Sequence, residues 1–301
     1  MRSPRLVVLL AAALGAAACG SGKHVTTPGE GTLGAELARP GPDVALIQGT
    51  SDHATGPVRV TFLVIDSKSR AIERPRARVW VGPSLGAPPT VSTDALLEPI
   101  GVPGKSESAT GGVSRIYVAR FPLPRAGTYT LVAEPEGTKI QGFAKIRVAR
   151  HPQAPAVGNK AIPSRTPTLA STHGDAAELT TASPPDLSLL RYSVADAIAA
   201  HAPFVLVFAT PKFCSSRTCG PVVDVAQAVQ RHFAGSGVRF IHVEVYTDNN
   251  PAQGYNRWFR EWRLPSEPWV FLVGRDGRIR QRFEGSVSVA ELSAAVRRLV
   301  D

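Results

Sequence analysis

The chain has 301 residues, 43% of them hydrophobic, and a formal net charge of +10. This length allows about two domains, and the apolar fraction is sufficient for packed cores. The basic residues are scattered along the sequence and do not alternate with aromatic residues. The charge pattern is therefore not typical of a nucleic-acid-binding surface, and we expect no nucleic-acid partner.

The N-terminal segment is typical of a targeting sequence. Arg2 and Arg5 precede an apolar run at 6–18, which is too short to span a bilayer. The run ends in Ala-Ala-Ala-Cys-Gly around Cys19, which resembles the processing site of bacterial lipoproteins. The resemblance implies cleavage before Cys19 and a diacylglycerol on its sulfur. Ala16 stands where the family usually has leucine, so cleavage by an ordinary signal peptidase is the alternative.

The N-terminal pattern predicts the first two segments of the chain. Residues 1–19 are expected to be a lipoprotein signal peptide with a lipidated Cys19. Residues 20–43 are rich in Gly, Thr and Pro and are expected to form a flexible tether. Two acyl chains would anchor the protein to the outer side of the bacterial cell membrane. Export would also place the remaining cysteines where disulfides persist.

Residues 44–150 are predicted to be all-β. Short segments with alternating or continuous apolar residues are separated by turns rich in Gly, Pro, Asp and Ser. The predicted strands are 58–66, 77–81, 113–121, 128–133 and 142–148. The segment Leu-Pro-Arg-Ala-Gly-Thr-Tyr-Thr-Leu at 123–131 resembles part of many bacterial immunoglobulin-like modules. The resemblance implies an immunoglobulin-like β-sandwich over 44–150.

The sequence pattern changes at residue 151 and again at residue 187. Residues 151–186 contain six prolines among Ser, Thr and Ala, which favours a linker, although the part near 161–163 could instead pack on the next domain as an ordered arm. From 187 the elements alternate, and Ser193 is a candidate cap for the first helix. The predicted elements are helix 194–201, strand 204–209, a helix from Pro221, strand 238–246, helix 255–263, a hairpin of strands 268–273 and 278–283, and helix 289–299.

Cys214 and Cys219 bracket four residues between the first strand of this region and the following helix. Disulfide exchange needs an accessible thiolate and a second thiol within reach. The helix N-terminus, with Lys212 and Arg217 nearby, would lower the pKa of an exposed cysteine. A disulfide requires Cα atoms within about 7 Å. The sequence therefore predicts that residues 215–218 form a loop and that the helix starts after Cys219.

The order of elements over 187–301 resembles the thioredoxin fold. The features that carry the resemblance are the strand leading into the cysteine turn, the next strand at 238–248, Pro268 at the start of a strand, and the final hairpin at 274–285. The predicted fold class is thus a two-domain chain, with an N-terminal sandwich and a C-terminal α/β thioredoxin-like domain. The resemblance also implies a cis Glu267–Pro268 bond beside the disulfide.

The chain departs from the thioredoxin pattern at two places. Four residues separate the cysteines instead of two, so either cysteine could be the nucleophile; we favour Cys214, which is farther from the helix body. Val207 and Phe208 occupy the neighbourhood where thioredoxins carry a buried acid. His242 on the neighbouring strand is a candidate for that proton-handling role, and the alternative is a hydrogen-bonded strand histidine.

The sequence most favours an extracytoplasmic, membrane-tethered thiol–disulfide oxidoreductase without a cofactor. Its expected partners are exported proteins that contain cysteines, a membrane redox partner, and the bilayer through Cys19. One alternative is a copper-binding or copper-delivery protein with Cys214, Cys219 and His242 as ligands, because thiolates suit Cu(I). Another is a non-catalytic module whose disulfide is structural. A peroxidase is less favoured, because the threonine of that family's cysteine motif lies on the wrong side of Cys214.

Overall fold

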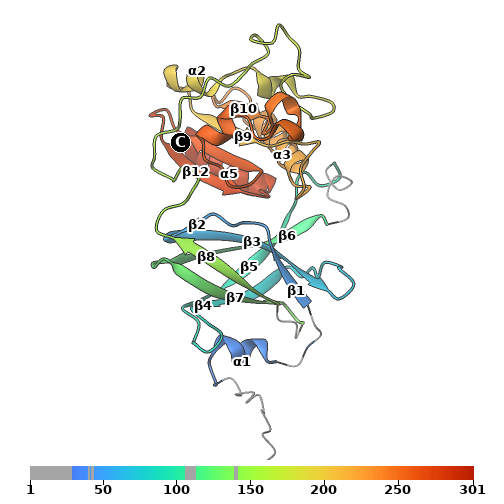
Figure 1. The fold of residues 1–301 in the computed structure, drawn as a ribbon, viewed down its shortest axis with the longest axis vertical. Coiled ribbons are helices and arrows are strands. Elements are labelled where there is room, and N and C mark those ends of the chain that lie inside the picture. Colours follow the sequence, from blue (N-terminus) through green and yellow to red (C-terminus); the bar gives the residue numbers. More distant parts are fainter. Residues whose placement is uncertain (1–28, 40, 42–43, 106–112, 139–141) are drawn as a thin grey trace, which may run out of the picture.

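The computed structural model describes residues 29–39, 41, 44–105, 113–138 and 142–301. The predicted signal peptide, its lipidated Cys19 and residues 20–28 of the tether lie outside the described residues. Within the described part of the chain, no helix combines the length and the apolar character needed to cross a membrane. Two β-sheets, stacked along the long axis of the molecule, make up most of the structure (Figure 1).

The first sheet contains eight strands in the order β1-β3-β6-β5-β4-β7-β8-β2. The strands are β1 Val44–Gln48, β2 His53–Ala54, β3 Gly56–Asp66, β4 Arg76–Gly82, β5 Val91–Pro99, β6 Arg115–Leu123, β7 Gly127–Pro135 and β8 Gly142–Ala149, and the short helix α1 (Leu33–Leu37) precedes them. The sheet curls so far that the side-chain amide of Gln48 in β1 donates a hydrogen bond to the backbone carbonyl of Lys145 in β8. Alternate residues of each strand therefore point into one enclosed core, in which Phe62 and Tyr117 stack at 5.4 Å.

The second sheet contains four strands in the order β10-β9-β11-β12. Its region comprises α2 Val194–Ala199, β9 Phe204–Phe208, α3 Cys219–His232, β10 Arg239–Val243, α4 Arg257–Glu261, β11 Trp269–Val273, β12 Ile279–Glu284 and α5 Val289–Val300, with short 3₁₀ turns at η1 Leu187–Leu190, η2 Thr247–Asn249 and η3 Pro251–Gln253. Strand β9 runs parallel to β10 and antiparallel to β11. Every residue of β9 is buried, because both faces of this sheet are covered.

The two faces of β9 separate its side chains into two cores. Val205 and Val207 pack with α3 and α5, whereas Phe204, Leu206 and Phe208 pack toward α4 and Trp262. Helix α3 buries an apolar stripe of Val222, Val225, Ala226 and Val229. The Ser193 side chain accepts a hydrogen bond from the amide of Asp196, which confirms the predicted cap of α2.

The predicted fold class is wrong. The eight N-terminal strands form one curled sheet, whereas an immunoglobulin-like sandwich has two packed sheets. The chain as a whole is mostly β, and the helices expected at 194–201 and 255–263 contain only six and five residues. They end before His201 and Arg263, whose φ angles of 48° and 51° leave the right-handed helical region. A clear C-terminal α/β thioredoxin-like domain is therefore not shown.

The segment 151–186 lies against the four-stranded sheet rather than hanging free as a linker. The Ala161 amide donates to the carbonyl of Gly277, and the Ile279 amide donates to the carbonyl of Asn159. Ala154 and Ala161 are buried in the core that Phe208 also lines. This packing agrees with the alternative in which the part near 161–163 is an ordered arm.

Buried ion pairs hold the two sheets together. Arg282 of β12 contacts Asp52 at 2.9 Å, and both side chains are largely buried. Arg59 of β3 forms a two-point contact with Glu291 of α5, with both N–O distances at 3.0 Å. Breaking either ion pair would leave a buried charge without its partner. The two ion pairs therefore fix the position of the eight-stranded sheet beside β12 and α5.

Candidate functional site: a disulfide at a cleft between the two sheets

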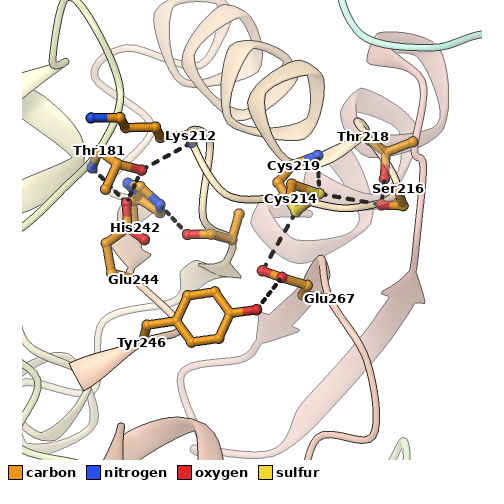
Figure 2. The surroundings of a disulfide bond; sticks show 11 residues. Thr181, Lys212, Cys214, Ser216, Thr218, Cys219, His242, Glu244, Tyr246 and Glu267 are labelled. Carbon is orange, nitrogen blue, oxygen red and sulfur yellow. Dashed lines mark hydrogen bonds between the residues drawn. A yellow bond between two sulfur atoms is a disulfide. The ribbon is translucent and has the colours of Figure 1, made fainter. Parts of the chain in front are cut away.

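Cys214 and Cys219 form a disulfide at the N-terminus of α3 (Figure 2). Their Cα atoms are 5.9 Å apart, within the range that a disulfide requires. Helix α3 begins at Cys219 itself, and residues 215–218 lie outside it. This confirms that the six-residue segment is not regular helix, although the helix begins two residues before Pro221. Arg217 in the loop has a φ of 58°, which closes the turn.

The two sulfur atoms differ in their access to solvent. Cys219 is completely buried, whereas Cys214 is half-buried in an exposed loop. The Cys219 amide donates to Sγ of Cys214 at 3.3 Å, and the Ser216 hydroxyl lies 3.2 Å from the same sulfur. Hydrogen-bond donors at a helix N-terminus favour a thiolate over a thiol. The arrangement therefore suits a reachable, activated Cys214 and a protected Cys219.

The three residues expected to tune the cysteines have different surroundings. Arg217 lies in the disulfide loop, as its sequence position requires. The Lys212 amine lies 5.4 Å from the ring centre of Phe213, and its backbone amide donates to Thr181. His242 is buried, with its Nε2 atom 3.0 Å from the Ala209 carbonyl oxygen. Figure 2 shows His242 and Lys212 apart from the two sulfur atoms, so of these three residues only Arg217 belongs to the loop that the disulfide closes.

A carboxylate that the sequence reasoning missed lies beside the buried sulfur. Oε2 of Glu267 is 3.6 Å from Sγ of Cys219, and the Tyr246 hydroxyl donates to Oε1 at 3.4 Å (Figure 2). The Glu267–Pro268 bond is cis, as the resemblance implied. The position of Glu267 immediately before Pro268 was the available signal, because a residue beside the proline had to lie near the disulfide.

Burial dominates the proton affinity of this carboxylate. Loss of solvent, with a smaller contribution from the negative charge of Glu244, raises the pKa of Glu267 to about 7; hydrogen bonds from Tyr246 and the Thr210 backbone oppose this shift. Burial and the nearby Glu267 carboxylate likewise raise the pKa of Tyr246 to about 12. Glu267 is thus a group that can gain or lose a proton near neutral pH.

The disulfide loop forms one wall of a cleft of about 650 Å³ between the two sheets. Tyr246, Tyr255, Ser266 and Glu267 line the same side. The opposite wall is mainly apolar and comes from the eight-stranded sheet, through Ile47, Leu63, Ile100, Val113 and Ile116. The cleft is large enough for several side chains of a bound polypeptide, and one of its walls carries the cysteine loop.

The ligand set of the copper alternative does not converge in this structure. The two ring nitrogens of His242 hydrogen bond to the Thr180 hydroxyl and the Ala209 carbonyl, apart from Cys214 and Cys219 (Figure 2). Across the residues that the structure describes, no three His, Cys, Asp or Glu side chains form a group that could hold a metal ion.

The chain matches no protein-family model and no curated protein sequence. Among solved structures it is similar to a thiol:disulfide interchange protein of the thioredoxin family from Chlorobium tepidum TLS, with 17% identity and a TM-score of 0.30 over 36% of this chain and 86% of that chain. It is also similar to an engineered protein, with 13% identity and a TM-score of 0.22 over 36% of this chain and 20% of that chain.

Proposed function

We propose that this protein is a thiol–disulfide oxidoreductase that exchanges its Cys214–Cys219 disulfide with disulfides of other proteins. One observation carries the proposal: the disulfide joins a half-buried Cys214, next to the loop residues that line the cleft, to a fully buried Cys219. A partner can reach only the first sulfur, and the second is available only to resolve the intermediate.

The proposed exchange needs two successive substitutions at sulfur. In the reduced protein, the Cys214 thiolate attacks a partner disulfide, bonds to one partner sulfur and expels the other as a thiolate. Cys219 then attacks Sγ of Cys214, which restores the internal disulfide and expels the remaining partner sulfur. The partner gains two electrons and the cysteine pair loses two. The reverse sequence oxidises a partner dithiol, and neither direction needs a bound cofactor.

The cleft supports a polypeptide as the partner. Its apolar wall can cover side chains next to the reacting cysteine, while the disulfide loop contributes hydroxyl groups and the exposed Arg217 at the other wall. A small soluble thiol would use little of this surface. The preferred substrate class is therefore a protein segment in extended conformation that carries a cysteine.

We also propose that the protein works outside the cytoplasm, anchored through a lipid on Cys19. The support is the basic, apolar and small-residue pattern before Cys19. Exported proteins with cysteines would then be the substrates, and a membrane redox partner would restore the pair. Membrane fractionation of wild-type protein and Cys19→Ser tests the anchor. Release of the variant into the soluble fraction is expected, and equal membrane retention of both proteins would refute it.

Trapping of the mixed disulfide tests the exchange itself. Cys219→Ser should accumulate a covalent adduct between Cys214 and a protein substrate that carries a disulfide, because Cys214 can attack that disulfide but the second substitution is blocked. Cys214→Ser should form no adduct and should not catalyse the reduction of insulin disulfides. Retained turnover in Cys214→Ser would exclude the proposed nucleophile. A reduction potential below about −300 mV would instead indicate a structural disulfide.

A further inference from the structure

The proposed exchange requires the buried Cys219 thiol to lose its proton. This loss must precede the attack on Cys214, because the thiolate is the nucleophile. Cys219 is fully buried, so bulk water does not reach its sulfur directly. A neighbouring side chain has to accept this proton and has to be able to pass it on.

We propose that Glu267 is the general acid–base for Cys219, taking its proton when the pair is oxidised and returning it when the pair is reduced. This inference rests on the proposed function. The carboxylate oxygen Oε2 lies 3.6 Å from Sγ of Cys219, a distance that sulfur hydrogen bonds span. The same side chain lines the cleft. Glu267 therefore connects the buried sulfur with solvent.

The groups around Glu267 suit a carboxylate that changes its protonation state. Tyr246, which follows β10 in the sequence, donates a hydrogen bond from its hydroxyl to Oε1 of Glu267. Its ring stacks on that of Tyr255, with the ring centres 5.5 Å apart. The backbone of Thr210, after β9, donates to the carboxylate, whereas the charge of Glu244 opposes its ionisation. Together with burial, these contacts keep the proton affinity of Glu267 near neutrality, where transfer in both directions is efficient.

The sequence-based candidate for this role has a different environment. His242 has its Nε2 atom on the Ala209 carbonyl and its Nδ1 atom 3.4 Å from the Thr180 hydroxyl. Both ring nitrogens are thus engaged within the protein interior, and the ring lies apart from the two sulfur atoms (Figure 2). Glu267 is the better-placed acceptor, because its oxygen faces the sulfur.

Each step of the proposed transfer balances. The Cys219 thiol gives its proton to Oε2 of Glu267, and its sulfur electron pair forms the bond to Cys214. The bond between Cys214 and the partner sulfur breaks, and its electron pair leaves with the partner as a thiolate. The protonated Glu267 then releases its proton through the cleft to water or to the departing thiolate. During reduction, the carboxylic acid protonates the Cys219 thiolate as it leaves Cys214.

A two-phase reaction with 5,5′-dithiobis(2-nitrobenzoate) separates this role from attack by Cys214. The protein is reduced in a Cys19→Ser background, so that Cys214 and Cys219 are its only thiols. The first coloured thiolate reports the attack by Cys214, and the second reports its resolution by Cys219. Glu267→Gln should leave the first phase unchanged and slow the second about 100-fold near pH 7. Glu267→Asp should restore part of the second-phase rate.

The pH profile and a matched control distinguish proton transfer from a structural effect. The second-phase rate of the wild type should rise through an inflection near pH 7, and Glu267→Gln should lack that inflection. Tyr246→Phe removes a hydrogen bond to the ionised carboxylate and should move the inflection to higher pH. Glu261→Gln is the control, because that carboxylate is exposed and accepts from Ser164. Both of its phases should match the wild type.

The outcomes that would overturn each proposal are different. An unchanged second phase and pH profile in Glu267→Gln would refute the role of Glu267 while leaving the exchange intact. Equal slowing of both phases in Glu267→Gln would assign Glu267 a structural role and would also refute the proposed proton transfer. The same conclusion would follow if Glu267→Gln changed the near-ultraviolet circular dichroism spectrum and Glu267→Asp failed to restore the rate. Absence of a second phase in the wild type would refute the proposed function itself.

Discussion

The elevated proton affinity of Glu267 predicts a specific dependence of stability on pH in the oxidised protein. Partial burial raises the pKa of this carboxyl group from an ordinary 4.5 to about 7. In full, such a shift corresponds to about 3 kcal/mol of folding free energy. The side chain borders the open cleft, and screening by solvent reduces the expected contribution to about 1–2 kcal/mol.

The sign of this contribution follows from proton linkage. Between pH 4.5 and 7 the unfolded chain releases the Glu267 proton, whereas the folded protein keeps it. The wild-type protein therefore loses stability as the pH rises through this window, and the loss is complete above about pH 7. Glu267→Gln cannot ionise and lacks this component. It should be more stable than the wild type by about 1–2 kcal/mol at pH 8, relative to their difference at pH 4.

Urea denaturation of both oxidised proteins at intervals from pH 4 to 8 measures this difference. Other titrating groups are common to the two proteins; burial lowers the pKa of His53, for example, which gives an opposite trend in both. Subtracting the two stability curves thus isolates Glu267. A difference that stays constant from pH 4 to 8 would show that Glu267 titrates near its ordinary value and would refute the reasoning.

Three further perturbations test the site and its support. Reduction of the Cys214–Cys219 disulfide, which closes a short loop, should lower the unfolding free energy by about 2 kcal/mol in urea titrations with and without dithiothreitol; an unchanged midpoint would contradict this. Arg59→Met should cost about 2 kcal/mol, because Glu291 loses its two-point partner and keeps only the half-exposed Arg120 as a cationic partner; a loss below about 1 kcal/mol would indicate a dispensable contact. Ile47→Ser should raise KM for a protein disulfide about tenfold and leave reduction of a small disulfide unchanged; equal effects on both would place substrates elsewhere.

Local features of the chain were predictable because each depends on residues close in sequence. The apolar run at 204–209 corresponds to the buried strand β9, and its burial on both faces leaves no alternation to detect. Ser193 lies just before a helix and caps it. The loop at 215–218 follows from the reach of a disulfide, which a continuous helix between the cysteines would exceed.

The incorrect fold class has a physical origin in strand pairing. Alternation along a strand defines which side chains are buried, but it does not define which strand lies next to it. The pairings β4–β7 and β5–β6 join the strands into one sheet, where a sandwich would divide them between two. The same alternating pattern is compatible with both arrangements, because each encloses one apolar face.

Glu267 was missed for a related reason. Its contact with Cys219 spans 48 residues, and its position before Pro268 carries no periodic signal. The resemblance to thioredoxins implies an acid within the strand that precedes the cysteines, where Val207 and Phe208 stand. In the structure the acid beside the Cys219 sulfur lies instead on the segment that leads into β11.

The eight-stranded sheet contributes to the site through its attachment to β12. The Glu284 carboxylate at the end of β12 accepts hydrogen bonds from the amides of Ser51 and Asp52, and from the Ser266 hydroxyl beside Glu267. One carboxylate thus joins the apolar wall of the cleft to the segment that carries the proposed acid–base. Because Asp52 also pairs with Arg282 in a largely buried contact, this connection restricts relative movement of the two walls. The substrate cleft and the proton acceptor should therefore be lost together when this junction is disrupted, even though the disulfide lies entirely within the C-terminal part.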